Sequence, residues 1–313
     1  MRAIPIPRSL HRILSGPTPS APRPMPIRDP TPDPGLFGPG SVTWVVMREP
    51  RLLLAAGRAL LLQAANPLVA QGAIEHSTYK SDPYGRLERT VRWVTVVCFG
   101  TTREAERVSG GVSRLHQPVT GTLPEANGTR RVPGGTPYSA GDPALLRWVH
   151  ASFVDTMLAA HDALVGGLSS GERDTFVREW DAVARLMGLA PTQSWPDAAA
   201  LRRYVDREVR RGQALPGAGS REVAETVLRP PVGSPLMRPG MDTLAFIATG
   251  LLPAELRRGY GLRWTPAHVA AFAGLTGSLR AATPAMPRRL RVSPVYDLAL
   301  ARAEGRWPAS RAA

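Results

Sequence analysis

The sequence predicts an all-α protein built around one large helical domain, and three observations carry this prediction. Most segments of the 313-residue chain have apolar residues at helical spacing. Helix start signals recur: Thr101 and Ser169 each precede a glutamate by three residues, and Asp142 and Thr265 each precede a proline. Strand signals are scarce, because 90–99 is the one β-rich run and it continues a helical pattern.

The helical periods and their start and stop signals place the elements in order along the chain. A Gly- and Pro-rich segment of roughly 24 residues, 118–141, interrupts them as a long loop, which in a compact domain is often functional. No second domain boundary follows residue 36, so we expect one domain over 36–313. Helices are expected at 50–75, 84–98, 102–117, 142–167, 171–187, 197–210, 220–228, 239–257, 266–281 and 293–304.

The N-terminal segment 1–35 predicts a disordered or loosely docked arm, because ten of its first 34 residues are proline. It has neither a continuous apolar stretch nor an arginine pair, so a secretory signal is not expected. The most apolar run, 52–74, is interrupted by Arg58, Gln63 and Asn66, which favours a buried core helix over a membrane span. Together these features predict a cytoplasmic protein.

The composition is that of a globular protein, with 43% hydrophobic residues and a net charge of +14. The basic side chains are almost all arginines spread through every helix, which argues against a nucleic-acid surface and leaves contact with anionic lipid or an acidic small molecule open. The single cysteine, Cys98, lies in an apolar run and is expected to be buried and unreactive. The sequence does not set the oligomeric state.

The start of the helix at 84–98 carries the first candidate site. On a helical wheel, Arg86 and Thr90 lie one turn apart along the edge of the apolar arc, whereas Arg89 lies mainly outside it. An arginine that faces the interior needs an anionic or strongly polar partner, because an unpaired buried charge is costly. That partner is either an internal Asp or Glu or a bound group.

Histidine supplies the second clue. His116 continues the apolar face of the helix at 102–117, and His150 does the same in 142–167, whereas His161 is expected at a helix surface. A lone histidine on an apolar face is more often a satisfied core residue than a ligand. No His-x-x-x-His or Glu-x-x-His pattern indicates a bare metal site.

The chain resembles a known family in a run of motifs around these residues. They are "GPGSVTWVV", "GRALLLQAANPLVAQGAIEHSTYKSDPYGRLERTVRWVTVVCFG", "RLHQPVTG" and "YSAGDPALLRWVHASFVDT", and the likeness extends over residues 36–300. They are similar to the bacterial DUF2236 proteins, relatives of the latex-clearing rubber oxygenases and of the fungal MpaB-type oxygenase. The resemblance implies an all-α, globin-like domain that binds haem b and uses O₂ to cleave a carbon–carbon double bond in polyprenyl chains.

The family's functional residues carry over individually. Its Arg-x-x-Arg/Lys-Thr motif matches Arg86, Arg89 and Thr90, its proximal haem histidine matches His116, and a structural histidine matches His150. The resemblance therefore implies that His116 ligates the haem iron, and we expect its imidazole to face an apolar cavity between the helices at 50–75, 84–98 and 142–167. Arg86 would hold a haem propionate or line the distal side, and Arg89 would lie near the rim. Thr90 would then contact a distal ligand.

Two positions differ from the family pattern or have only a positional match. Asn66-Pro67 stands where the family has His-Pro, and Glu75 is the positional candidate for the acid–base carboxylate of the oxygenases. We therefore expect a haem b-dependent oxygenase of an apolar olefinic or terpenoid substrate. The alternatives are a haem-binding protein without turnover and a cofactor-free helical protein that binds lipid or another small apolar molecule.

Overall fold

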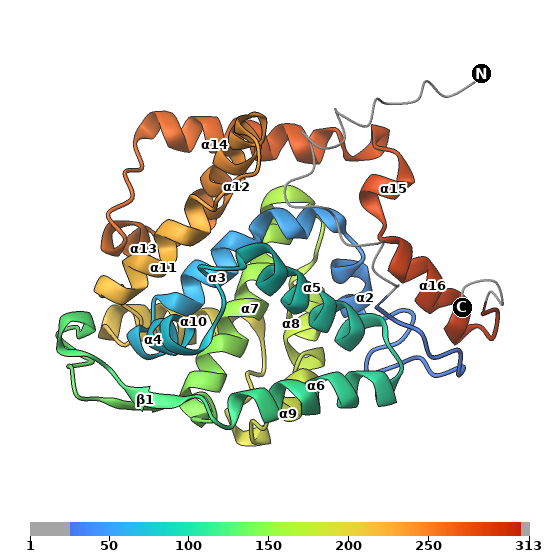
Figure 1. Ribbon diagram of the computed structural model, residues 1–313. Helices are drawn as coiled ribbons and strands as arrows, with labels where there is room; N and C mark the ends of the chain where they lie inside the picture. Colours follow the sequence, from blue (N-terminus) through green and yellow to red (C-terminus); the bar gives the residue numbers. More distant parts are fainter. Residues whose placement is uncertain (1–25, 308–313) are drawn as a thin grey trace.

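The computed structural model describes residues 26–307, which form a mostly helical domain with one small β-hairpin. The prediction of an all-α fold is therefore confirmed except for this hairpin (Figure 1). The longer helices are α3 (Ala56–Ala64), α4 (Pro67–His76), α5 (Pro83–Phe99), α6 (Thr102–His116), α7 (Pro143–Leu164), α8 (Ser170–Glu179), α10 (Ala198–Arg211), α11 (Ala218–Leu228), α12 (Arg238–Leu251), α14 (Pro266–Ala281) and α16 (Pro294–Ala303).

Shorter elements connect these helices. They are α2 (Val42–Met47), α9 (Asp181–Leu186), α13 (Ala254–Gly259), α15 (Arg288–Arg291), the 3₁₀ turns η1 (Pro50–Ala55), η2 (Glu125–Asn127), η3 (Pro191–Gln193), η4 (Pro235–Met237) and η5 (Thr283–Ala285), and the strands β1 (Thr120–Thr122) and β2 (Pro137–Ser139). The antiparallel pair β1–β2 closes the predicted long loop 118–141, with Gly121 opposite Tyr138.

Helix α7 is the central element of the fold. It packs against η1, α3, α10, α12 and α14, and most of its side chains are buried. Three tryptophans, Trp44, Trp148 and Trp180, are the largest side chains of the core. A buried indole N–H needs an acceptor, and two of these tryptophans find one on the backbone. Trp44 Nε1 donates to Cys98 O at 2.8 Å, and Trp148 Nε1 donates to Gln63 O at 3.1 Å.

The predicted long helix at 50–75 is wrong in detail, because the chain breaks into η1, α3 and α4. Asn66 ends the run: its side chain caps α4 by accepting from Leu68 N at 2.9 Å, and Pro67 occupies the first helical position. The helical segments 50–64 and 67–76 form a bent pair, in which the chain direction changes by 107°. Within the described residues no single helix has both the length and the apolarity of a membrane span, although this bent pair has them when taken together.

The expectation of a loose arm over 1–35 is not met by its described part, residues 26–35; residues 1–25 lie outside the described chain. Ile27 is buried in the core, and the backbone N–H groups of Arg28 and Asp29 donate to Glu104 Oε1 at 2.8 and 3.0 Å. Glu104 also closes the predicted capping box with Thr101. The same carboxylate therefore caps α6 and holds the start of the domain.

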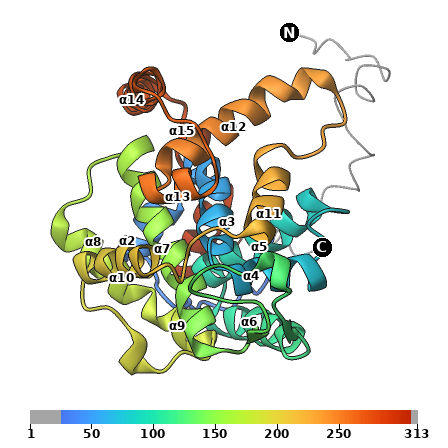
Figure 2. The same ribbon diagram turned by 90° about the vertical axis from the view of Figure 1, so that its left-hand side faces the viewer.

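Two further expected helices are split, at 171–187 into α8 and α9 and at 239–257 into α12 and α13. In Figure 2, α12 and α14 extend from one end of the molecule, away from α6 and α9 at the other end. Helix α12 nevertheless packs closely on α3 at its inner end, where a Cβ added to Gly57 would lie 2.9 Å from Cβ of Ala248. This close approach shapes one wall of the cavity described next.

Candidate functional site

An apolar cavity of about 320 Å³ lies between α3, α4, α11, α12 and the start of α5. Its volume is at the lower end of the range for small-molecule sites. The walls are mainly aliphatic, and representative side chains are Leu60, Val69, Leu87, Val223, Leu244 and Ala248. Leu53 and Tyr84 also line the cavity and are partly exposed, so the cavity communicates with solvent on their side.

Among the residues that the structure describes, Arg86 is the one charged side chain in this lining. Local sequence places it there: Asp82 caps α5 by accepting from Gly85 N at 2.9 Å, Pro83 begins the helix, and Arg86 follows in the first turn. The sequence left the partner of Arg86 open between an internal acid and a bound group, and the structure places its side chain in the cavity wall.

The guanidinium of Arg86 forms no salt bridge and no side-chain hydrogen bond within residues 26–307. Burial lowers its pKa, and the neighbouring charge of Arg89 lowers the pKa further. An arginine remains charged at any physiological pH, so the wall carries a positive charge that no carboxylate of residues 26–307 neutralises by a salt bridge.

The two phenols in the wall direct their hydroxyl groups to other protein atoms. Tyr79 Oη donates to Glu222 at 3.0 Å, and Tyr84 Oη donates to Pro231 O at 2.6 Å. Burial, followed by the hydrogen bond to Glu222, raises the pKa of Tyr79. Both phenols therefore stay protonated, and Arg86 is the strongest polar group that the wall presents to a ligand.

Arg89 and Thr90 lie beside Arg86 on α5 but outside the cavity lining. Arg89 is exposed and pairs with Asp82 at 3.2 Å and with Thr78 Oγ1 at 2.9 Å. Thr90 is also exposed, and its hydroxyl donates to Arg86 O at 3.1 Å. The expectation that Thr90 shares the cavity side of the helix is therefore wrong. The first turns of α5 are packed on one side only, and continuous burial begins near Val94.

His116 ends α6, where its side chain is exposed and does not line the cavity. The expectation that it faces an apolar cavity between the predicted helices is wrong for the described structure. The reason is the path of the two helices: α5 and α6 stay packed as far as Trp93 and Ser109, whose side chains bond at 3.2 Å, and then spread apart, so the end of α6 lies away from the cavity (Figure 1). Partial burial lowers the pKa of the imidazole, so the His116 ring is neutral at pH 7.

His150 and His161 are both core residues of α7. His150 stacks on Trp195 with ring centroids 5.9 Å apart, and burial lowers its pKa to about 4. His161 was expected at a surface, but it is 3% exposed, and burial is the main cause that lowers its pKa to about 4. The helical period of α7 did not predict the burial of His161, because five elements pack around this helix and cover nearly every face of it.

Glu75 belongs to a polar cluster between α4 and the β-hairpin. It accepts hydrogen bonds from the Tyr138 hydroxyl and from Gln71 Nε2, the latter at 2.7 Å, and His76 Nε2 lies 3.7 Å away. The bond from Tyr138 and then that from Gln71 lower the pKa of Glu75. The sequence did not identify Tyr138 and Gln71 as partners of Glu75. The one available signal was that Gln71 lies one helical turn before Glu75.

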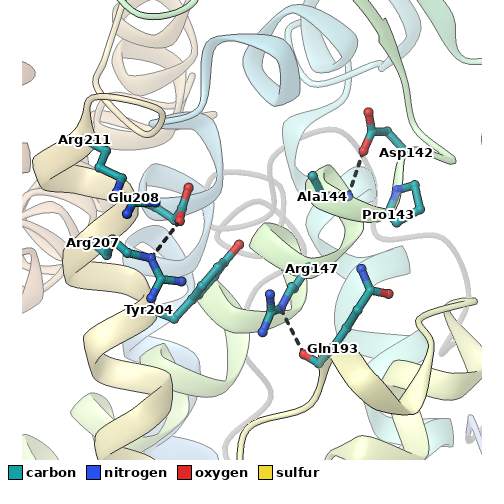
Figure 3. Close-up of a pocket in the computed structure, with 9 residues that line it drawn as sticks. All are labelled: Asp142, Pro143, Ala144, Arg147, Gln193, Tyr204, Arg207, Glu208 and Arg211. Atoms are coloured by element: carbon teal, nitrogen blue, oxygen red, sulfur yellow. Dashed lines mark hydrogen bonds and ion pairs between the residues drawn. The ribbon is translucent and has the colours of Figure 1, made fainter.

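A second hollow, of about 620 Å³, lies between the start of α7 and α10 (Figure 3). Five charged side chains line it, and most of them have partners within the described residues. Arg147 Nε donates to Gln193 O at 2.9 Å while its guanidinium lies over the Tyr204 ring, and Arg207 pairs with Glu208 at 3.5 Å. It contains none of the predicted site residues, so the apolar cavity is the stronger candidate.

Comparison with known proteins identifies one family. The family model described as "ER-bound oxygenase mpaB/B'/Rubber oxygenase, catalytic domain" matches residues 43–281, which is well over half of the chain. The matched range contains every wall of the apolar cavity, the Arg86–Thr90 turn and His116. No curated protein and no solved structure matches the chain.

Proposed function

We propose that this chain, which belongs to the family of mpaB and rubber oxygenase catalytic domains, is an oxygenase that uses O₂ on an apolar olefinic or terpenoid substrate. The observation that carries the proposal is the apolar cavity with one unpaired arginine in its wall. An aliphatic lining suits a hydrocarbon chain, since burial of apolar surface contributes about 25 cal/mol per Å².

We also propose that the activity depends on haem b, with His116 as the iron ligand. The donor chemistry fits: the His116 imidazole is neutral and accessible, which is the state that binds a metal. Arg86 offers a guanidinium without a carboxylate partner among the described residues, which suits a propionate group. Arg89 would join it by exchanging its contact with Asp82 for a second propionate. When bound, haem supplies the redox chemistry with O₂ that the side chains of this protein lack.

The protein's own residues have separate roles in this proposal. The cavity walls bind and desolvate the substrate chain, and Arg86 supplies a fixed positive charge that orients polar groups. Glu75 is ionised and held by Tyr138 and Gln71, so it is suited to accept rather than donate a proton. Thr90 has an accessible hydroxyl one turn from Arg86 and is proposed to contact a small distal ligand. His150, inside the core, supports the fold rather than touching haem.

Oxygen consumption tests the proposed activity. The full chain, produced with added haem precursor and iron, should consume O₂ faster when an isoprenoid olefin such as squalene is present than with its saturated counterpart squalane. Carbonyl products from the olefin should appear in step with O₂ loss. Equal rates with both hydrocarbons, and no carbonyl product from a panel of isoprenoid olefins, would reject the oxygenase.

A cofactor-free binder of apolar molecules is the second candidate, and one observation favours it. No histidine lines the described cavity, so a ligand that enters it meets no imidazole. A purified chain that retains an apolar ligand, lacks a haem absorption band and consumes no O₂ would support this alternative. The globin-like arrangement implied by the sequence resemblance remains a separate prediction.

A further inference from the structure

The charge on the cavity wall requires a partner that the described chain does not supply. Two acidic groups beside this wall are engaged with other cations: Glu222 with Lys80 at 2.5 Å and Asp82 with Arg89 at 3.2 Å. Arg86 has neither contact and is partly desolvated. A cation in an apolar, partly buried place is costly unless an anion joins it, so the wall is complementary to a negative group.

The rest of the wall is complementary to an apolar tail. Leu60, Val223 and Ala248 come from three different helices, and the hydroxyl groups of Tyr79 and Tyr84 already have acceptors. A ligand that fills the cavity therefore finds aliphatic contacts on most sides and one charged group on α5. This pattern of a mostly apolar pocket with a single polar anchor fixes both the position and the orientation of a ligand.

The partly exposed side of the cavity also carries a positive charge, like the wall at Arg86. Arg238, at the start of α12, acts electrostatically on Tyr84 and donates to Pro230 O at 3.5 Å. Tyr84 and Pro230 both line the cavity. A second arginine therefore stands near this side, and it favours the approach of anions over cations.

We propose that the cavity binds a single-tailed amphipathic anion, with its carboxylate or phosphate head at Arg86 and its hydrocarbon tail along the aliphatic wall. This inference rests on the proposed function in that it names the substrate class as an acidic apolar molecule rather than a neutral hydrocarbon. A guanidinium binds either head through paired N–H donors, so the two heads share one recognition chemistry.

Calorimetric titration of the full-length protein with three matched twelve-carbon ligands tests the inference. The probes are dodecanoate, dodecyl phosphate and dodecan-1-ol, each below its aggregation concentration. The wild-type protein should bind at least one of the two anions about tenfold or more tightly than the alcohol, because a charge-assisted contact is stronger than a neutral one. The relative affinity of the two anions distinguishes a carboxylate site from a phosphate site.

Variants locate the preference. Arg86→Gln should reduce the ratio of anion to alcohol affinity to about one, and Arg86→Lys should retain part of it. Arg92→Gln is the matched control, because this arginine of α5 is exposed, lies outside the lining and has no part in the proposed haem site, and it should keep the ratio. Far-ultraviolet circular dichroism checks that each variant is folded.

Three results would overturn the inference: equal wild-type affinity for alcohol and anions, no binding of any probe, or an anion preference that survives Arg86→Gln. The outcome is independent of catalysis, since it needs neither haem nor O₂. Anion binding without oxygen consumption would reject the proposed oxygenase and keep the inference. Oxygen consumption on neutral olefins without an anion preference would reject the inference and keep the proposed oxygenase.

Discussion

Two arginines on helices that line the same cavity, Arg58 of α3 and Arg86 of α5, have opposite surroundings. Arg58 is 1% exposed and fully engaged: Nε donates to Leu251 O at 2.8 Å, and its terminal nitrogens reach Thr156 Oγ1 and Asp155 Oδ2, each at 2.5 Å. Arg86 lines the cavity with no such partner within the described chain. The first arginine holds three helices together, whereas the second contributes little to the fold and is available to a ligand.

Sequence pattern alone does not separate a structural arginine from one that is available to a ligand. Both residues lie in predicted helices, at positions where the helical period would place a side chain toward the interior. The difference is whether other helices bring a carboxylate to the guanidinium. Asp155 reaches Arg58 from α7 across 97 positions of the chain, and no residue does the same for Arg86 among those described.

Replacing Arg58 should have the largest effect. Arg58→Met leaves the buried Asp155 without its close partner, and the free energy of unfolding should fall by about 3–5 kcal/mol. Arg202→Gln is the control, because Arg202 is exposed and meets Asp155 only at 3.5 Å, and it should cost less than about 1 kcal/mol. Urea unfolding measures both. Equal losses of unfolding free energy for the two variants would show that the buried pair of Arg58 with Asp155 contributes no more than the exposed contact of Arg202.

The acid sensitivity of the core should be the next largest effect. His150 has its pKa lowered to about 4 by burial, so below pH 6.5 the unfolded chain binds a proton that the folded chain does not. Its stabilising contribution is complete above pH 6.5 and is lost as pH falls toward 4, by about 1.4 kcal/mol per pH unit. Denaturant unfolding across this range should show a flatter pH dependence in His150→Phe. An unchanged slope would show that His150 titrates normally.

Arg86→Gln should change function far more than stability. The free energy of unfolding should shift by less than about 1 kcal/mol in either direction, because no protein partner is lost and a desolvated charge is removed. Substrate-dependent O₂ consumption should fall by about tenfold or more. A loss of several kcal/mol in stability would place Arg86 in the same structural class as Arg58 and break the comparison.

Thr90→Val should have the smallest effect on the fold. Thr90 is exposed and its hydroxyl bonds only to the preceding turn of its own helix, so the unfolding free energy should change by less than about 0.5 kcal/mol. Its effect should appear instead in the binding of a small haem ligand such as azide or cyanide, followed by absorption. A variant that binds these ligands as the wild type does would remove Thr90 from the site.

Much of the fold was predictable because its signals are local. Caps such as Thr101 with Glu104, and prolines at first helical positions, place helix starts within a few residues. The break at Asn66 was missed, although its capping side chain and Pro67 were visible, because the apolar pattern continues through it. Here the Asn66 cap and Pro67 end one helix and start the next, although apolar residues continue at helical spacing through the break.

The site was only partly predictable, because its geometry depends on contacts between distant segments. The inward position of Arg86 followed from the period of one helix. The exposure of His116 and Thr90 depends on how α5 and α6 diverge, and the burial of His161 depends on the elements around α7. No pattern within one helix contains that information. The cluster of Glu75 with Tyr138 likewise requires the β-hairpin to fold back onto α4.

The absorption spectrum of the purified protein tests the central proposal most directly. Full-length protein produced with added haem precursor and iron should show an intense Soret band, and His116→Ala should lose it. His76→Ala is the matched control: its ring lies at the end of another helix, where Nε2 is 3.1 Å from Thr120 O, and this variant should keep the band. Wild-type protein without the band, or a band of equal intensity in His116→Ala, would contradict the account.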